Sequence, residues 1–336
     1  MSKFILYIGN DLVKKSNYIS SMETLSELLI KENFKVQKSS NKNNKILRLL
    51  DMCLTVVKNR NKIDYILIDT FSTTNFYYAF IVSQLARLFN LKYIPILHGG
   101  DLPKRIDKSK WMSNLIFNHS YKNIAPSNYL KSEFEKRRYL TCYIPNVLEI
   151  EKYDFEIRNT LSPKILWVRA FRHLYNPKLA IEVLILLKNR FPKATLCMIG
   201  PAKDDSFKVV QELVIKHKLK YSVEFTGVLS KEKWHHKSKD FDVFINTTNF
   251  DNTPVSVMEA MALGLTIVST NAGGLPYLIE NNVEGVLVEK NNSEQMAMAI
   301  VKLIQENNQE LSKAARKKAE SFNWKIVREK WFSILK

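Results

Sequence analysis

Residues 246–264 read NTTNFDNTPVSVMEAMALG, and LTIVSTNAGG follows them up to Gly274. The largely apolar residues 241–245 just upstream predict a buried strand. Thr253 and Pro254 are typical of an N-cap and a first helical residue, so we expect a helix to begin at Pro254. Gly264 is a typical helix end, and the β-branched residues 266–269 predict the next strand. The pattern is strand, loop, helix, strand.

Glu259 falls on a helical stripe that otherwise looks buried, together with Val255, Met258 and Ala262. A buried carboxylate needs a partner, and two interpretations fit. It is structural and takes a backbone amide or an arginine from a neighbouring loop, or it faces a crevice and binds the vicinal hydroxyls of a ribose. Asp251 lies eight positions earlier, and free N–H groups at the helix start favour an anion. Together these groups are suited to a sugar and a phosphate.

This stretch resembles the acidic-x7-Glu motif of the retaining glycosyltransferases of family 4, with that family's Glu-Ala-Met-Ala-x-Gly helix and Gly-Gly loop. The resemblance implies the GT-B fold, an α/β architecture of two Rossmann-like domains whose parallel sheets face each other across a cleft. It implies that Glu259 binds the donor ribose and that Asp251 contacts the donor sugar. The loop residues that join Asp251 in this contact are Asn252, Thr253, Pro254 and Val255. The family usually has Glu where this chain has Asp251, which is one methylene shorter.

A second element, HGGD at residues 98–101, follows a predicted strand at residues 93–97. Open α/β sheets bind ligands at this carboxyl end of their strands. His98 is interpreted either as a turn histidine that bonds nearby backbone or as a functional residue. Family 4 chains often carry His-Gly-x-Asp here, and the resemblance implies that His98 lies against the donor sugar near the reacting centre. Asp101 is then expected to orient His98 or the following loop, on the acceptor side.

Three cations, Arg169, Arg172 and Lys178, surround the start of the helix predicted at Asn176 and Pro177. Cations at a helix N-terminus repel its dipole unless an anion such as a donor diphosphate is bound. In family members an arginine and a lysine occupy nearby positions, but here they fall out of register. We expect Arg169 to supply the arginine and Lys178 or Arg172 to supply the lysine. The alternative is that all three are plain surface cations.

Four glycines complete the predicted donor site. Gly200 and Gly227 end predicted strands, where the missing side chain allows a nucleotide base to approach the backbone. Gly273 and Gly274 lead into a helix and are expected to offer backbone N–H groups to phosphate. Tyr277 stands where the family commonly has Glu, so no acid role is expected there.

Strands and helices are predicted to alternate along the whole chain, beginning with a strand at residues 4–9 and a helix at residues 18–32. This alternation favours parallel sheets covered on both faces. A chain of 336 residues, 46% of them hydrophobic, can form two cores of ordinary size. We predict a Rossmann-like acceptor-side domain at residues 1–155 and a Rossmann-like donor domain at residues 156–320. The resemblance implies that a final helix, residues 321–336, crosses back to the first domain.

The formal charge of +18 calls for an explanation, and basic residues gather in three clusters of the N-terminal half. These are Lys35, Lys38, Lys42, Lys45 and Arg48; Lys104, Arg105, Lys108 and Lys110; and Lys131, Lys136, Arg137 and Arg138. Such clusters are suited to an anionic membrane surface, but abundant lysine on a solvated surface explains them equally well. Nucleic acid is disfavoured because no aromatic residues are interleaved with the clusters.

No metal and no cofactor are expected. Asp240-Phe241-Asp242 has the form of a metal-binding Asp-x-Asp, but Asp242 opens a predicted buried strand and the GT-B fold generally functions without that motif. His235 and His236 lie in a polar, lysine-rich segment and are expected at the surface. The absence of a G-x-G-x-x-G motif disfavours a nicotinamide dehydrogenase.

The function predicted by the resemblance is retaining transfer of a sugar from a UDP- or GDP-sugar to a saccharide or lipid-linked acceptor, in bacterial surface polysaccharide or glycolipid synthesis. The alternatives are a nucleotide-sugar epimerase of the GT-B fold and a non-catalytic nucleotide-sugar-binding scaffold. The three dispersed cysteines and the lack of a long apolar run predict a cytoplasmic protein, either free or peripheral at the inner face of the plasma membrane.

Overall fold

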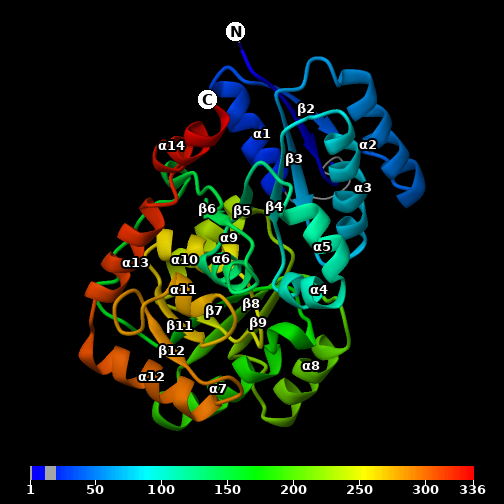
Figure 1. The fold of residues 1–336 in the computed structure, drawn as a ribbon. Helices are drawn as coiled ribbons and strands as arrows, with labels where there is room; N and C mark the ends of the chain where they lie inside the picture. The colour runs from blue at the N-terminus through cyan, green and yellow to red at the C-terminus, as the bar shows by residue number, and fades with distance from the viewer. Residues whose placement is uncertain (1, 12–19) are drawn as a thin grey trace. The chain divides into compact units, whose positions relative to one another are not determined.

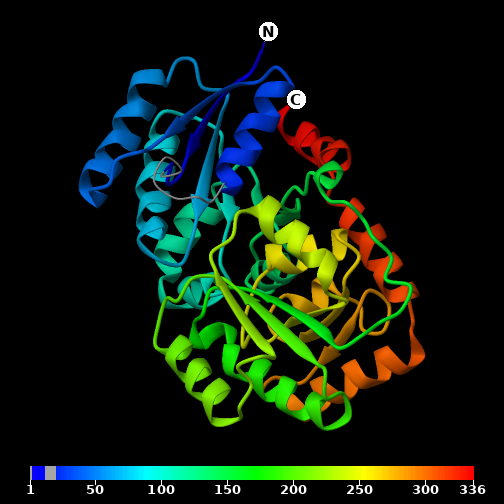
Figure 2. The same cartoon turned by 180° about the vertical axis from the view of Figure 1, so that it is seen from behind.

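A computed structural model describes residues 2–11 and 20–336 of the chain. Residues 18 and 19, where the first helix was predicted to begin, lie outside this described part; the helix is described from Ser21 to Lys31. The chain forms two compact units, one of Met1–Val147 with Trp324–Lys336 and one of Leu148–Asn323. Figure 1 shows the course of the chain, and Figure 2 shows it from behind.

The first unit contains a six-stranded parallel sheet in the order β2-β1-β3-β4-β5-β6. Its elements are β1 (Phe4–Ile8), α1 (Ser21–Lys31), β2 (Lys35–Ser39), α2 (Lys45–Asn59), β3 (Tyr65–Thr70), α3 (Thr74–Leu88), β4 (Tyr93–Leu97), α4 (Leu102–Lys108), α5 (Lys110–Phe117), β5 (Asn123–Ala125), α6 (Asn128–Glu135), β6 (Thr141–Tyr143) and α14 (Trp324–Leu335).

Helices cover both faces of this first sheet. The connection through α1 runs from β1 to β2, toward one edge of the sheet. The connections through α2 (from β2 to β3) and α3 (from β3 to β4) run toward the other edge. Because such crossovers are right-handed, α1 lies on the opposite face of the sheet from α2 and α3. Two cores reflect this division: Met22 of α1 packs in one of them and Met52 of α2 packs in the other. The central strands β1, β3 and β4 are therefore buried on both sides and consist mostly of apolar residues, whereas the edge strand β2 is partly exposed and largely polar.

The second unit also contains a six-stranded parallel sheet, in the order β12-β11-β10-β7-β8-β9. Its elements are η2 (Ile150–Lys152), β7 (Lys164–Val168), η3 (His173–Tyr175), α7 (Pro177–Arg190), β8 (Thr195–Ile199), α8 (Ser206–Lys216), β9 (Val223–Gly227), α9 (Lys231–Lys237), η4 (Ser238–Asp240), β10 (Val243–Asn246), α10 (Val255–Ala262), β11 (Thr266–Thr270), α11 (Leu275–Leu278), β12 (Val286–Val288), α12 (Ser293–Glu306) and α13 (Glu310–Glu320).

The boundary between the units lies at Val147 and Leu148, rather than at the predicted residue 155. Leu148 and Tyr153 are buried in the core that lies beside α10, so the segment before residue 155 packs with the second unit. The chain returns to the first unit at Trp324, where Val327 and Trp331 of α14 pack in the core beside α1.

The helix α10 begins at Val255, one residue later than predicted, with Pro254 as its N-cap. It ends at Ala262, and Gly264 follows with φ of +81°, a conformation that glycine adopts without strain. Every residue from Ser256 to Ala262 is buried, because the helix lies against the sheet on one side and α13 on the other. The charged Glu259 is therefore enclosed on a helix that is otherwise mostly apolar.

None of the helices in the described residues has both the length and the apolar composition needed to cross a bilayer.

Candidate functional site

The order of strands in the second unit reverses direction between β10 and β7. The helix α7 leads from β7 to β8 on one side, whereas α10 leads from β10 to β11 on the other. In open α/β sheets the crevice at such a reversal, outside the carboxyl ends of the strands, is the usual ligand site. The loops that follow β7 and β10 both start at this edge, and they contain Arg169 and Asp251.

Arg169 and Asp251 form an ion pair across this reversal point, through Nη2 and Oδ2. Both side chains are largely buried, with 22% and 13% exposed. The second oxygen of Asp251 accepts a hydrogen bond of 2.8 Å from the amide of Asn252, and the Arg169 guanidinium lies 4.3 Å from the ring centre of Tyr175. The predicted phosphate-binding arginine and the predicted sugar-binding carboxylate are therefore brought together and neutralise each other.

The two glycines at positions 273 and 274 support the loop that carries Asp251. A Cβ atom at Gly274 would come within 1.7 Å of the carbonyl oxygen of Asn252, and one at Gly273 within 2.2 Å of that of Asp251. The amide of Gly274 donates a 2.8 Å hydrogen bond to the carbonyl of Asp251. This differs from the prediction that Gly274 offers its N–H group to phosphate, because the amide is already used to hold the loop.

Glu259 has the partners that a buried carboxylate requires. Its Oε1 accepts a 3.0 Å hydrogen bond from the Tyr153 hydroxyl and lies 2.8 Å from the Lys231 ammonium group. The side chain of Lys231 is 47% exposed, whereas that of Glu259 is 5% exposed. The buried carboxylate is therefore paired with a lysine that is itself partly exposed to solvent. Neither Tyr153 nor Lys231 is the backbone amide or the arginine that the structural interpretation expected.

Two more side chains shape the surroundings of Glu259. Burial, and then the nearby Glu259 charge, raise the pKa of Tyr153 well above its usual range, so its hydroxyl stays a donor. The ring of His235 lies 4.7 Å from that of Tyr153, and burial lowers the pKa of His235. The prediction that His235 is at the surface is wrong, because the ring is half-buried beside Trp234, while its neighbour His236 is exposed.

The two remaining cations are exposed, whereas the loop residues range from buried to exposed. Lys178 forms an exposed ion pair of 3.0 Å with Glu182 on its own helix, and Arg172 is exposed. Of the loop residues predicted to contact the donor sugar, Asn252 and Pro254 are buried, Thr253 is half-buried and Val255 is exposed. Only Arg169, among the three predicted cations, is therefore held against another predicted site residue.

The two strand-ending glycines differ in their surroundings. A Cβ atom at Gly200 would lie 1.9 Å from the carbonyl oxygen of Arg169, so this glycine is needed for backbone packing beside Arg169. Gly227 has φ of +68°, and a Cβ atom there would meet no heavy atom within 4 Å. The open space fits the predicted approach of a ligand at Gly227 better than at Gly200.

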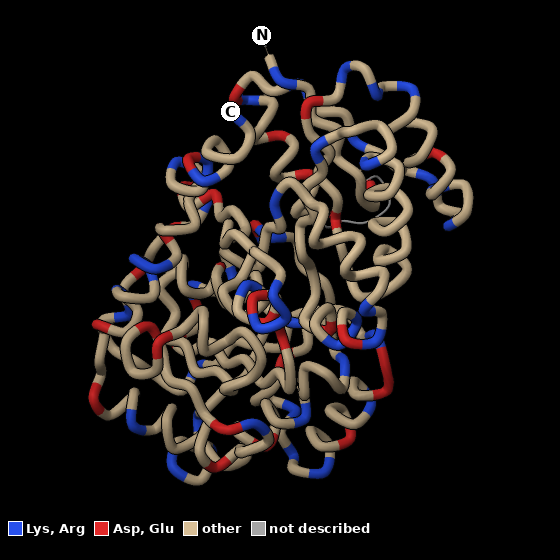
Figure 3. The backbone as a smooth tube through the Cα atoms, viewed as in Figure 1, with Lys and Arg blue, Asp and Glu red and all other residues tan. Residues whose placement is uncertain are grey.

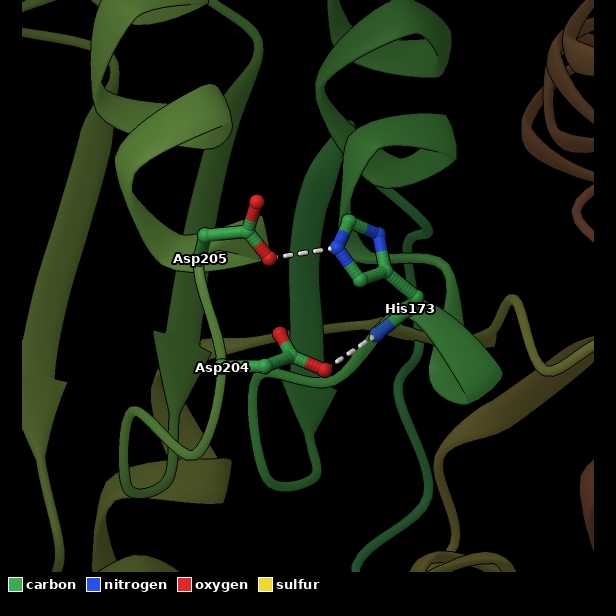
Figure 4. A group of neighbouring side chains, drawn as sticks. All are labelled: His173, Asp204 and Asp205. Atoms are coloured by element: carbon green, nitrogen blue, oxygen red, sulfur yellow. Dashed lines mark hydrogen bonds and ion pairs between the residues drawn. The ribbon is translucent and has the colours of Figure 1, made fainter.

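A hydrogen-bonded cluster of His173, Asp204 and Asp205 joins the loops after β7 and β8 (Figure 4). The ring Nε2 of His173 lies 2.6 Å from Asp205, and its backbone amide donates to Asp204 at 2.9 Å. The hydrogen bond to Asp205 raises the pKa of His173. The three donor atoms lie within 4.8 Å of one another, a spacing that suits a metal ion, but all three residues are exposed and already bonded to one another. We interpret the cluster as a clasp between the two loops.

In the first unit, His98 follows β4 and is buried, with Nε2 2.9 Å from Oδ1 of Asp69. The Tyr7 hydroxyl donates to the same oxygen at 3.0 Å, and burial followed by the Asp69 charge raises the pKa of Tyr7. The ring of Phe71 stacks on His98 at 4.7 Å. The His98 ring is therefore held by a side chain, whereas the turn interpretation expected nearby backbone; the His98 amide does donate to the carbonyl of Thr70, at 2.8 Å.

Asp101 does not orient His98. It is exposed, forms a 3.4 Å ion pair with Lys104 and precedes α4, whereas Asp69 holds the His98 ring. Asp69 was not among the residues singled out from the sequence, although an acid near the carboxyl end of a buried strand is a signal for a ligand-site residue. Tyr153 and Lys231 were also missed, and no local pattern links them to Glu259, which is 106 positions from Tyr153.

The model of the family described as glycosyl transferases group 1 matches residues 150–322, more than half of the 336-residue chain. A putative colanic acid biosynthesis glycosyltransferase of Escherichia coli is 30% identical over 136 residues, which cover 38% of this chain and 34% of that protein. An amylovoran biosynthesis glycosyltransferase of Erwinia amylovora is 28% identical over 166 residues, covering 47% and 40%. The chain therefore matches well under half the length of these two relatives.

Solved structures resemble the whole chain. Anabaena Alr3699/HepE in complex with UDP has a TM-score of 0.78 at 17% identity and covers 100% of this chain and 99% of its own. The sucrose-phosphate synthase of Thermosynechococcus elongatus has a TM-score of 0.81 at 15% identity, covering 99% and 98%. These likenesses, with the two six-stranded parallel sheets, confirm the predicted GT-B fold. The family match extends from the start of the second unit almost to its end, and it includes Glu259, Asp251 and Arg169. The chain belongs to the glycosyl transferases group 1 family.

Proposed function

We propose that this protein is a retaining glycosyltransferase of family 4 that moves a sugar from a UDP- or GDP-sugar to a saccharide or lipid-linked acceptor. The observation that carries the proposal is Glu259, a carboxylate enclosed on α10, eight positions after an aspartate that pairs with Arg169 at the strand reversal. The UDP bound in the Anabaena complex supports a nucleotide-sugar donor. The colanic acid and amylovoran relatives support a role in bacterial surface polysaccharide or glycolipid synthesis.

In this proposal Glu259 accepts hydrogen bonds from the ribose hydroxyls of the donor. The partly exposed side chain of Lys231, which is paired with Glu259, would either move away from the carboxylate or form a hydrogen bond with the nucleotide. Arg169 would exchange Asp251 for the diphosphate, and Asp251 would then be free to contact the donor sugar. The exchange keeps the Arg169 guanidinium paired with an anion before and after donor binding, which limits its cost.

The transfer step breaks the bond between the anomeric carbon and the phosphate oxygen, and the electron pair leaves with the nucleoside diphosphate. Arg169 and the N–H groups at the start of α10 would stabilise the charge that develops on this leaving group. The acceptor hydroxyl attacks from the same face, and its proton passes to the leaving phosphate oxygen. His98 would lie near the donor sugar, and the first unit would select the acceptor.

The proposal includes no metal and no cofactor, so removal of divalent cations with EDTA should leave turnover unchanged. It places the protein in the cytoplasm, with the inner face of the plasma membrane as a peripheral location. The family match gives no support to the epimerase or to the non-catalytic scaffold.

A thermal-shift screen against UDP-, GDP- and ADP-sugars tests the proposal. A donor at a hundred times its dissociation constant should stabilise the wild type by about 2.7 kcal/mol. Glu259→Ala should lose this shift, whereas Glu212→Ala, which removes an exposed carboxylate on α8 of the same unit, should keep it. Glu259→Gln serves if the alanine variant does not fold.

Each other outcome has a clear meaning. Equal shifts for the wild type and Glu259→Ala would remove the assignment of the ribose to Glu259, and no shift with any donor would remove the proposal. A donor that is converted in the absence of any acceptor would instead indicate an epimerase, and a donor that binds but is never turned over would indicate a scaffold.

A further inference from the structure

The helix α2 is apolar on two sides. On the inner side Met52 and Val56 are fully buried against the sheet. On the outer side Ile46, Leu47, Leu50 and Leu54 are between 51% and 71% exposed. These four residues lie at helical spacing on one stripe, so they form a continuous apolar strip that faces solvent.

The neighbouring helices α3 and α5 extend this apolar strip. On α3 the residues Tyr77, Ile81 and Leu88 are 46%, 37% and 74% exposed, and they lie on one side of the helix. On α5 Trp111 is 69% exposed. Eight of the 21 large hydrophobic side chains that are exposed in the described residues therefore lie on these three helices.

The three helices lie side by side on the same face of the first sheet, as both ribbon views show (Figures 1 and 2). The Tyr78 hydroxyl on α3 donates to the carbonyl of Lys45 at the start of α2. The ring of Phe80 on α3 lies 5.6 Å from that of Trp111 on α5. We call the outer sides of α2, α3 and α5 the apolar face.

The charges on these helices are almost all positive. Asp51 is the one acidic residue in α2, α3 and α5, all of which are described. Exposed basic residues lie at the ends of the helices, among them Lys45 and Lys58 on α2 and Lys110 on α5, and Arg60 follows α2 directly. Figure 3 shows the distribution of these charges along the backbone. An apolar surface bordered by lysine and arginine is the composition that binds an anionic bilayer interface.

We infer that the apolar face binds the surface of an anionic lipid bilayer, with the leucine side chains and Trp111 among the acyl chains and the basic residues at the phosphates. A second copy of the chain fits this surface less well, because it would bring two rims of the same positive charge together. The inference specifies the membrane location included in the proposed function, and it does not require that the protein transfers a sugar.

Vesicle sedimentation tests the inference. The protein should bind vesicles of phosphatidylcholine with one quarter phosphatidylglycerol, and binding should fall at least tenfold with phosphatidylcholine alone. The double variant Leu50→Gln with Leu54→Gln should reduce binding to the anionic vesicles at least tenfold. The matched control, Ile215→Gln with Met298→Gln, changes two residues on α8 and α12 of the other unit that are more exposed than Leu50 and Leu54, and it should bind as the wild type does.

Quenching by brominated lipids reports which residues enter the bilayer. Vesicles with brominated acyl chains should quench the tryptophan fluorescence of the wild type, and Trp111→Phe should lose most of the quenching. Of the other four tryptophans, Trp167, Trp234 and Trp331 are buried, and Trp324 is half-buried against the core beside α1. If the double variant binds vesicles as strongly as the wild type does and Trp111 is not quenched, the assignment to the apolar face is overturned. Absence of binding would also overturn it, and so would a stable dimer that the double variant converts to a monomer.

The donor screen keeps this test separate from the proposed function. If the double variant still shows the wild-type thermal shift with a nucleotide-sugar, a loss of vesicle binding concerns the membrane surface alone. If the wild type binds vesicles but no donor, the proposed function fails and the membrane surface stands.

Discussion

The hydroxyl of Tyr153 donates a hydrogen bond of 3.0 Å to Oε1 of Glu259, across 106 positions of sequence. Tyr153 lies in the segment that enters the second unit, and Glu259 lies in the middle of α10. The segment that begins the unit thus supplies a partner for the buried Glu259 carboxylate.

Tyr153→Phe should lower the free energy of unfolding by about 1.5–3 kcal/mol, because a buried hydrogen bond to a charged group is lost. Urea unfolding curves measure this change. Tyr221→Phe is the matched control, since Tyr221 is 93% exposed, and its effect should stay within about 0.5 kcal/mol. An unchanged unfolding midpoint for Tyr153→Phe would show that Lys231 alone satisfies Glu259.

Asp69→Ala should destabilise the protein by about 2 kcal/mol or more, because His98 and Tyr7 each lose the acceptor that they share and each buried polar group left unbonded costs about 1–3 kcal/mol. Asp101→Ala, close to His98 in sequence but exposed, should change stability by no more than about 0.5 kcal/mol. Denaturation of both variants in urea measures the difference. Equal losses would restore Asp101 as the residue that orients His98.

Arg169→Met and Asp251→Asn should affect donor binding in different ways. Arg169→Met should weaken both UDP and a UDP-sugar about ten- to a hundredfold, because a charged hydrogen bond to the diphosphate is lost. Asp251→Asn should weaken the UDP-sugar more than UDP, because it leaves Arg169 intact and removes only the proposed sugar contact. Titration calorimetry with both ligands gives the two ratios. A uniform loss for Asp251→Asn would argue that the aspartate merely holds the loop.

Gly274→Ala should destabilise the protein more than Gly227→Ala does. The new methyl group at position 274 would meet the carbonyl oxygen of Asn252 at 1.7 Å, so the loop that carries Asp251 must shift. In Gly227→Ala the new methyl group would have no heavy atom within 4 Å. The variant should therefore lose only about 1–2 kcal/mol of stability, the cost of placing alanine at a positive φ. Thermal unfolding of the two variants, with UDP binding as a second readout, measures the difference. Equal costs would mean that the loop yields without strain.

The clasp of His173 and Asp205 should make stability depend on pH. The folded pKa of His173 is raised above 6.5 by its hydrogen bond to Asp205, so the clasp contributes fully below about pH 6.5, and the contribution is lost as pH rises through the folded pKa. His173→Gln should therefore lower the melting temperature more at about pH 5.5 than at about pH 8.5. In the Asp205→Asn variant, His173→Gln should lower the melting temperature equally at the two pH values. A pH-dependent effect of His173→Gln that persists in that variant would show that other groups cause it.

Much of the fold was predictable because its signals are local. The apolar strands, the glycine that ends α10 and the alternation of strands and helices are properties of short segments, and they predicted the parallel α/β architecture. The pairing of Arg169 with Asp251 was not predicted, although both residues had been singled out, because it depends on β7 and β10 being neighbours in the sheet.

The sequence by itself determined the element types, the GT-B resemblance and the position of Glu259 on a buried helix. Tertiary structure alone decided which distant side chains meet it, since Tyr153 and Lys231 reach Glu259 from segments that share no periodic pattern with α10. It also decided which of the two apolar sides of α2 faces the sheet, because helical spacing places Met52 on one side and Leu50 on the other without distinguishing core from solvent. Local propensity acts within a few residues, whereas the partners of a buried charge and the exposed side of a helix are set by how whole elements pack.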